Sequence, residues 1–135
     1  MKYYLSKIIK GKFHPTIDRV TELLKEEGFG IITEIDVKKT LKTKLDVDYK
    51  NYVILGACNP NLALRAFTAE DKIGTLLPCN VTVIDQGEGN IEVAIMDAVN
   101  MMSHIGNPEL EVLAIEVSER MERVLMNLGH HGHLD

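Results

Sequence analysis

The sequence contains no long apolar segment. No stretch approaches the roughly 20 consecutive apolar residues that cross a bilayer, and the N-terminus carries no apolar core of signal-peptide length. These absences argue against a membrane protein and predict a soluble, cytoplasmic one.

Basic residues are too few and too scattered for a nucleic-acid-binding surface. Fifteen Lys and Arg stand against 20 Asp and Glu, which gives a net charge of -5, whereas nucleic-acid-binding domains gather Lys and Arg on one face. The one basic cluster, within residues 38–44, is flanked by aspartates and lacks interleaved aromatic residues, as is typical of a solvated helix face. We expect no nucleic-acid partner.

Reactive residues are scarce and form no complete motif. Cys58 and Cys79 are the two cysteines, and their spacing resembles neither a zinc CxxC pair nor a thioredoxin motif. In a reducing compartment we expect two free thiols, although the sequence alone leaves a disulfide open. Gly87-Glu88-Gly89 lacks the lysine and the following helix of a phosphate-binding loop.

The composition favours one folded unit. The chain has 135 residues, of which 45% are hydrophobic, enough for a single core and one domain over residues 1–135. We expect residues 129–135 to form a flexible tail. The tail includes His130, His131 and His133, a composition compatible with metal binding, but its terminal position favours a solvated segment.

Hydrophobic periodicity predicts an α+β protein with the order strand, helix, four strands and helix, and with short helical insertions. Strands are expected over residues 2–10, 29–35, 52–58, 80–85 and 91–97. Long helices are expected over residues 14–28 and 107–129, and shorter ones over 37–45 and 59–71. The continuous apolar run at 52–58 indicates a central strand.

Helix starts are marked by capping residues. Asp36 precedes the helix at 37–45, and an Asn-Pro pair begins each of the helices at Asn59 and Asn107. An Asn cap satisfies a free backbone donor, and Pro at the first helical position removes another. Glycines at 87 and 89 indicate a hairpin between the strands at 80–85 and 91–97.

Each cysteine lies in a string that contains a proline. The strings are Gly56-Ala57-Cys58-Asn59-Pro60 and Leu77-Pro78-Cys79-Asn80-Val81. Cys58 ends one predicted strand and Cys79 begins the next, so both thiols are expected at one edge of the sheet.

With Ile73-Gly74 and with Gly28-Phe29 and Asp36, these strings resemble the family known as domain of unknown function 302. The resemblance covers nearly the whole chain. It implies a topology like that of the TATA-binding protein, with a curved antiparallel sheet, two long helices on one face and a homodimeric assembly. It implies no activity, and a shared fold does not bring DNA binding with it.

Three functions remain open. The first is a non-enzymatic binding protein that holds a small molecule or a soft metal near Cys58, Asn59, Cys79 and Asn80. The second is a thiol-dependent enzyme or redox sensor that uses Cys58, whose thiol would be activated by the following helix N-terminus. The third is an interaction module in which the cysteines only pack.

A soft-metal site would need Cys58 and Cys79 to be joined by a third ligand such as His104. Methionines 96, 101 and 102 also suit soft metals, but adaptable core packing is their commoner role. Asp85, Asp97, Glu34 and Asp36 are carboxylates near strand ends, where turns and caps usually use them. Apolar residues on both sides of the strand at 52–58 predict a covering partner, most economically a second copy of the chain.

Overall fold

The computed structural model describes residues 2–129 and confirms the expected order of elements. The His-rich segment at 130–133 lies outside the described residues, as does most of the expected tail. The elements are β1 (Tyr4–Lys10), α1 (Phe13–Glu26), β2 (Gly30–Asp36), α2 (Val37–Leu45), β3 (Tyr52–Cys58), α3 (Pro60–Ala69), the 3₁₀ helix η1 (Asp71–Leu76), β4 (Cys79–Gly87), β5 (Asn90–Met96), α4 (Ala98–Met102) and α5 (Pro108–Asn127).

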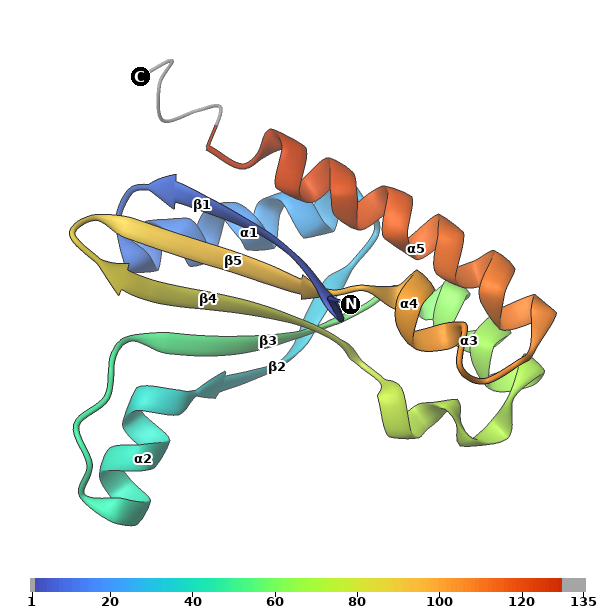
Figure 1. The fold of residues 1–135 in the computed structure, drawn as a ribbon, viewed down its shortest axis with the longest axis horizontal. Coiled ribbons are helices and arrows are strands. Elements are labelled where there is room, and N and C mark those ends of the chain that lie inside the picture. Colours follow the sequence, from blue (N-terminus) through green and yellow to red (C-terminus); the bar gives the residue numbers. More distant parts are fainter. Residues whose placement is uncertain (1, 130–135) are drawn as a thin grey trace.

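The strands form one antiparallel sheet in the order β1-β5-β4-β3-β2 (Figure 1). The apolar strand β3 lies inside the sheet between β4 and β2, as predicted. The edge on the other side is formed by β1, which pairs with β5 and leaves β4 as the middle strand. The β4–β5 hairpin is as predicted, and Gly87, Glu88 and Gly89 turn the chain with positive φ.

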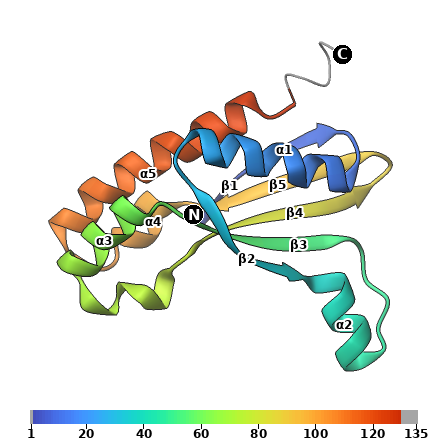
Figure 2. The ribbon, with the colours of Figure 1, turned by 180° about the vertical axis from the view of Figure 1, so that it is seen from behind.

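Helices α1 and α5 cover one face of the sheet, as expected (Figures 1 and 2). Alternate strand residues point toward them, because strand side chains alternate between faces. The buried strand residues on this side are Val53, Leu55, Ala57, Val81, Val83, Ile91, Val93 and Ile95. They pack with Val20 and Leu24 of α1 and with the apolar stripe of α5 in a single core cluster.

Helix α2 is peripheral, as its thin apolar stripe predicted. The carboxylate of Asp36 accepts a hydrogen bond from the backbone N–H of Lys39 at 3.0 Å, and no residue of the helix is buried. The helix lies on the side of the sheet away from α1 and α5 (Figures 1 and 2).

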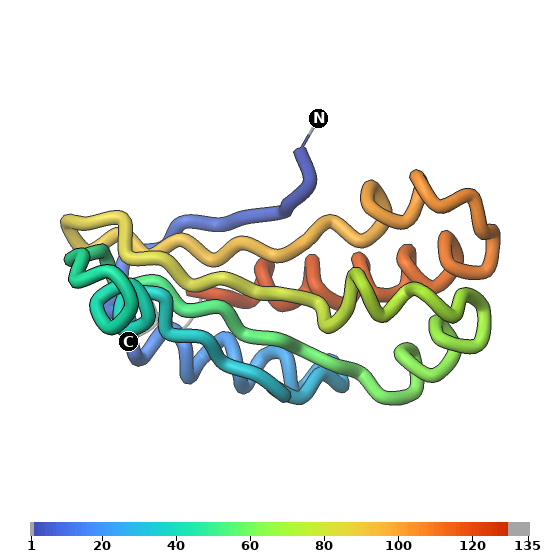
Figure 3. The backbone as a smooth tube through the Cα atoms, turned by 90° about the horizontal axis from the view of Figure 1, so that it is seen from below, coloured from blue at the N-terminus to red at the C-terminus, as the bar shows by residue number. Residues whose placement is uncertain are grey.

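The second face of the sheet has little cover. Figure 3 shows the strands in front of α1 and α5, with only α2 lying before one end of the sheet. Within residues 2–129, no helix combines the length and the apolar character needed to cross a membrane.

Helix α5 extends past one end of the sheet. Its 20 residues span about 30 Å, about as much as the nine residues of β4, but its C-terminal end lies over the middle of β1. Lys7 of β1 fixes the end of the helix, since its Nζ donates to the carbonyl oxygens of Leu125 at 3.1 Å and Leu128 at 2.7 Å. The N-terminal half of α5 therefore projects past the sheet, over α3 and α4 (Figure 1).

Replacing Lys7 with Met should lower the free energy of unfolding by about 1–2 kcal/mol, because the last carbonyls of α5 lose a cationic donor. Lys10, which is exposed on the other face of β1, provides the control. Lys10→Met should change stability by less than about 0.5 kcal/mol. Urea denaturation measures both variants, and equal midpoints for the two would contradict the role assigned to Lys7.

Candidate functional site

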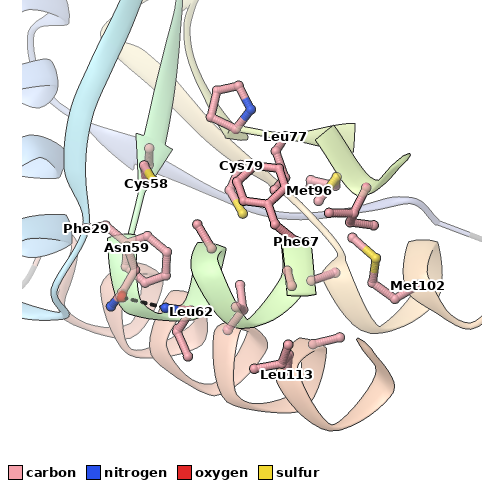
Figure 4. Close-up of a pocket in the computed structure, with 18 of the residues that line it drawn as sticks. Phe29, Cys58, Asn59, Leu62, Phe67, Leu77, Cys79, Met96, Met102 and Leu113 are labelled. Carbon is pink, nitrogen blue, oxygen red and sulfur yellow. Dashed lines mark hydrogen bonds between the residues drawn. The ribbon is translucent and has the colours of Figure 1, made fainter. Parts of the chain in front are cut away.

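An apolar cavity of about 320 Å³ lies past the end of the sheet at which β3 ends, β4 begins and β5 ends (Figure 4). Helix α3, η1, α4 and the projecting half of α5 surround it. Its lining residues are Phe29, Ile32, Ala57, Cys58, Asn59, Leu62, Ala63, Ala66, Phe67, Ile73, Gly74, Leu77, Pro78, Cys79, Met96, Ala98, Met102, Leu110, Leu113, Ala114 and Val117.

The two Asn-Pro helix starts hold the walls of the cavity in place. The side-chain oxygen of Asn59 accepts from the Leu62 N–H at 3.1 Å, which turns the chain from β3 directly into α3. Asn107 caps α5 in the same way, by accepting from the Glu109 N–H at 3.0 Å. Its amide also donates to the Ala69 carbonyl at 3.0 Å, so the start of α5 is tied to the end of α3.

The packing around position 56 explains why the first cysteine string contains a glycine. A Cβ added at this position would lie 2.8 Å from Cγ of Pro78 and would also clash with the hydroxyl of Thr33. Only glycine lets the neighbouring strand and the proline of the second string approach β3 this closely. The two strings are thus packed against each other at the cavity wall.

Both cysteines lie where the sequence placed them. Cys58 is the last residue of β3 and Cys79 the first residue of β4, and both are free, partly exposed thiols. Cys79 pairs with Ala57 across the two strands, so these two side chains lie on the same face of the sheet. Cys58 follows Ala57 in β3, and its side chain therefore points to the opposite face. The strand register therefore does not place the two thiols directly opposite one another.

Cys79 is a poor nucleophile at neutral pH. Burial raises the pKa of its thiol to about 11, and the nearby Cys58 adds to the increase. A thiol with this pKa remains protonated and behaves as a small hydrophobic group.

The predicted ligand-binding residues are only partly brought together. Cys58, Asn59 and Cys79 line the cavity. Asn80 does not, because it pairs with Gly56 and faces the other side of the sheet, where it lines a shallow groove with Tyr52 and Thr82.

The structure does not bring His104 to the cysteines. This histidine is exposed in the turn between α4 and α5 and is not among the residues that line the cavity. Among residues 2–129, no three His, Cys, Asp or Glu side chains are placed so that they could hold a metal ion. Met96 and Met102 do line the cavity, and Met101 does not.

Three of the four carboxylates near strand ends bond to the backbone, as turn and cap residues do. Asp36 and Asp97 cap α2 and α4, and Asp85 accepts from the Gly87 N–H at 2.9 Å in the hairpin. Glu34 is exposed on β2.

The helical walls of the cavity carry no clear sequence signal. Leu62, Phe67 and Leu113 have the apolar spacing of ordinary core residues and yet line the cavity. The signal that the sequence does carry is a pair of small residues on two helices that face each other. Ala66 and Ala114 are short side chains on opposing helices, and their small size leaves space between α3 and α5.

The fold and the cavity define a small α+β protein with an open antiparallel sheet, two long helices on one face and an apolar site past one end of the sheet. The chain belongs to the family described as Domain of unknown function DUF302, whose model matches residues 5–128.

A solved structure supports this assignment. The chain is similar to the crystal structure of an uncharacterized conserved protein DUF302 from Bacillus stearothermophilus, with 26% sequence identity and a TM-score of 0.87. The similarity covers 95% of this chain and 99% of that one. No curated protein matches the sequence.

Cys79 in a Cys58→Ser variant should react with iodoacetamide roughly a hundredfold more slowly than a free thiol at about pH 7.5, because little thiolate is present. The rate should keep rising well above the pH at which an ordinary thiol levels off, because burial, the main cause of the raised pKa of Cys79, remains in this variant. The folded state should also lose stability as the pH rises from 9.0 to about 11, since only the unfolded chain releases the proton in that range.

The control is the same variant in urea, where unfolding should restore the ordinary rate. A folded-state rate that levels off near pH ~8.5 would show that the environment of Cys79 is not the buried one described.

Proposed function

We propose that this protein is a non-enzymatic, homodimeric binding protein that holds a small apolar molecule in the cavity past the end of its sheet. The observation that carries the proposal is the cavity itself. Its volume of about 320 Å³ falls within the range of roughly 300–1,000 Å³ that is typical of small-molecule sites.

The lining selects for an apolar occupant. The described residues around the cavity include no Asp, Glu, His, Lys or Arg, and the one side-chain amide is that of Asn59. The oxygen of this amide caps α3, which leaves its NH2 group and the two thiols as the polar side-chain groups of the lining. A charged or strongly polar ligand would lose its water and gain few partners, at a cost of several kcal/mol.

The size and the opening suit a molecule of two or three rings. An apolar cavity of about 150 Å³ accepts benzene, and this one has roughly twice that volume. Ile32 and Phe67 line the cavity and remain 61% and 45% exposed, so a ligand has a route in beside them.

Two observations favour binding over the thiol-enzyme alternative. Cys79 is held in its protonated form. No general acid or base lies among the described residues that line the cavity with Cys58, and thiol catalysis usually depends on such a partner. Soft-metal binding has less support, because His104 is remote from the two cysteines.

The wild-type protein should bind N-phenylnaphthylamine, a neutral probe that fluoresces in apolar surroundings, with a Kd in the micromolar range. Ala66→Leu fills the cavity and should weaken binding by about tenfold or more. Thr68→Leu is the matched control, because it adds an apolar side chain to the same helix at an exposed position outside the cavity. Fluorescence titration measures all three proteins.

Equal affinity in the two leucine variants would place the probe elsewhere on the protein. Absence of probe binding to the folded wild-type protein would remove the proposal.

The uncovered face of the sheet supports the homodimer. The strand register places Ile35 beside Ile54 and places Thr82 between Ile54 and Ala94, which gives an apolar band across the strands. Ile8 and Ile35 on this face are 58% and 49% exposed. Lys10 and Glu92 add charges of both signs, so two copies related by a twofold axis can pair opposite charges.

The protein should therefore run as a dimer at micromolar concentration in size-exclusion chromatography with light scattering. Ala94→Glu places an unpaired charge in the band and should shift the protein to monomer. Val112→Glu, at a position of α5 that is 62% exposed, should leave the dimer intact. A monomeric wild-type protein would contradict the assembly, and dissociation of the Val112 variant alone would move the interface to the helices.

A further inference from the structure

Sulfur atoms are concentrated at the cavity. The sequence contains two cysteines and six methionines, and both cysteines line the cavity together with Met96 and Met102. Figure 4 shows Cys79, Met96 and Met102 on the side of the cavity away from Phe29 and Asn59, and Cys58 nearer to these two residues. Sulfur therefore contacts the cavity from both sides.

Two phenylalanine rings add to the polarizable surface that the sulfur atoms form in the lining. Phe29 and Phe67 both line the cavity, and they are two of only three phenylalanines in the chain. Phe67 packs close to Gly74, where an added Cβ would lie 3.5 Å from its ring. Thioethers, thiols and phenyl rings are polarizable groups that make favourable contacts with the edges and faces of aromatic rings.

The lack of cationic side chains among the described residues of the lining disfavours anionic ligands. A carboxylate or sulfonate needs a cation or several N–H donors, and no Lys, Arg or His is among the described residues that line the cavity. The amide Nδ2 of Asn59 is the one side-chain N–H donor among these residues. A single neutral donor is too little to replace the water around an anionic head group.

We infer that the cavity selects a neutral aromatic or conjugated molecule over a saturated hydrocarbon of the same size and over an anionic amphiphile. This inference rests on the proposed function and adds the chemical class of the ligand. The selectivity arises from the four sulfur atoms and two phenyl rings of the lining, since purely aliphatic walls would accept both kinds of hydrocarbon according to size alone.

Competition against bound N-phenylnaphthylamine tests the class of ligand in the wild-type protein. Naphthalene and decahydronaphthalene share a two-ring carbon skeleton and differ in aromaticity, and naphthoate adds a negative charge to the aromatic rings. Naphthalene should displace the probe at about tenfold lower concentration than decahydronaphthalene. Naphthoate at about pH 7.5 should be weaker than naphthalene by a similar factor or more.

Replacing the two methionines of the lining gives a second test of the aromatic selectivity. Leucine conserves the volume of Met96 and Met102 while removing sulfur, so the double variant Met96→Leu/Met102→Leu should reduce the preference for naphthalene to about twofold to threefold. Met121→Leu is the matched control, because Met121 is buried in the core but does not line the cavity. It should keep the wild-type preference.

The outcomes separate the two proposals. Equal displacement by naphthalene and decahydronaphthalene would overturn the aromatic selectivity and leave an apolar binding site in place. Stronger displacement by naphthoate would overturn the exclusion of anions. Absence of probe binding to the wild-type protein would remove the binding function together with the inference drawn from it.

Discussion

The cavity depends on where helix α5 ends over the sheet. Lys7, the middle residue of β1, holds the C-terminal end of the helix through the carbonyls of Leu125 and Leu128, so the N-terminal half of α5 projects past the end of the strands. The projecting half needs cover for its apolar stripe, and α3, η1 and α4 supply it. The cavity lies between these helical pieces and α5.

The cysteine strings act on this arrangement mainly through their other residues. Gly56 lets Pro78 and Thr33 approach β3, and Asn59 turns the chain from β3 into α3. The Cys79 thiol contributes soft, uncharged surface, since burial keeps it protonated. The strings are therefore determinants of the shape of the site.

The sequence predicted the parts of the fold that depend on local chemistry. Asp36, Asn59 and Asn107 began helices where expected, because a side-chain cap acts within three residues. Pairings between distant segments carry no such local signal. The pairing of β1 with β5, which makes β4 the middle strand, was missed for this reason. The same limit hid the cavity, because the space around Ala66 and Ala114 exists only when two helices remote in sequence face each other.

The most direct test of an apolar, ligand-accepting cavity is diffraction from a crystal of the protein pressurised with xenon, which enters dry apolar cavities and scatters anomalously. An anomalous peak is expected inside the cavity, among the apolar residues that line it. A cavity that instead contains only hydrogen-bonded water, or one that is closed by inward movement of the Phe67 ring, would contradict it.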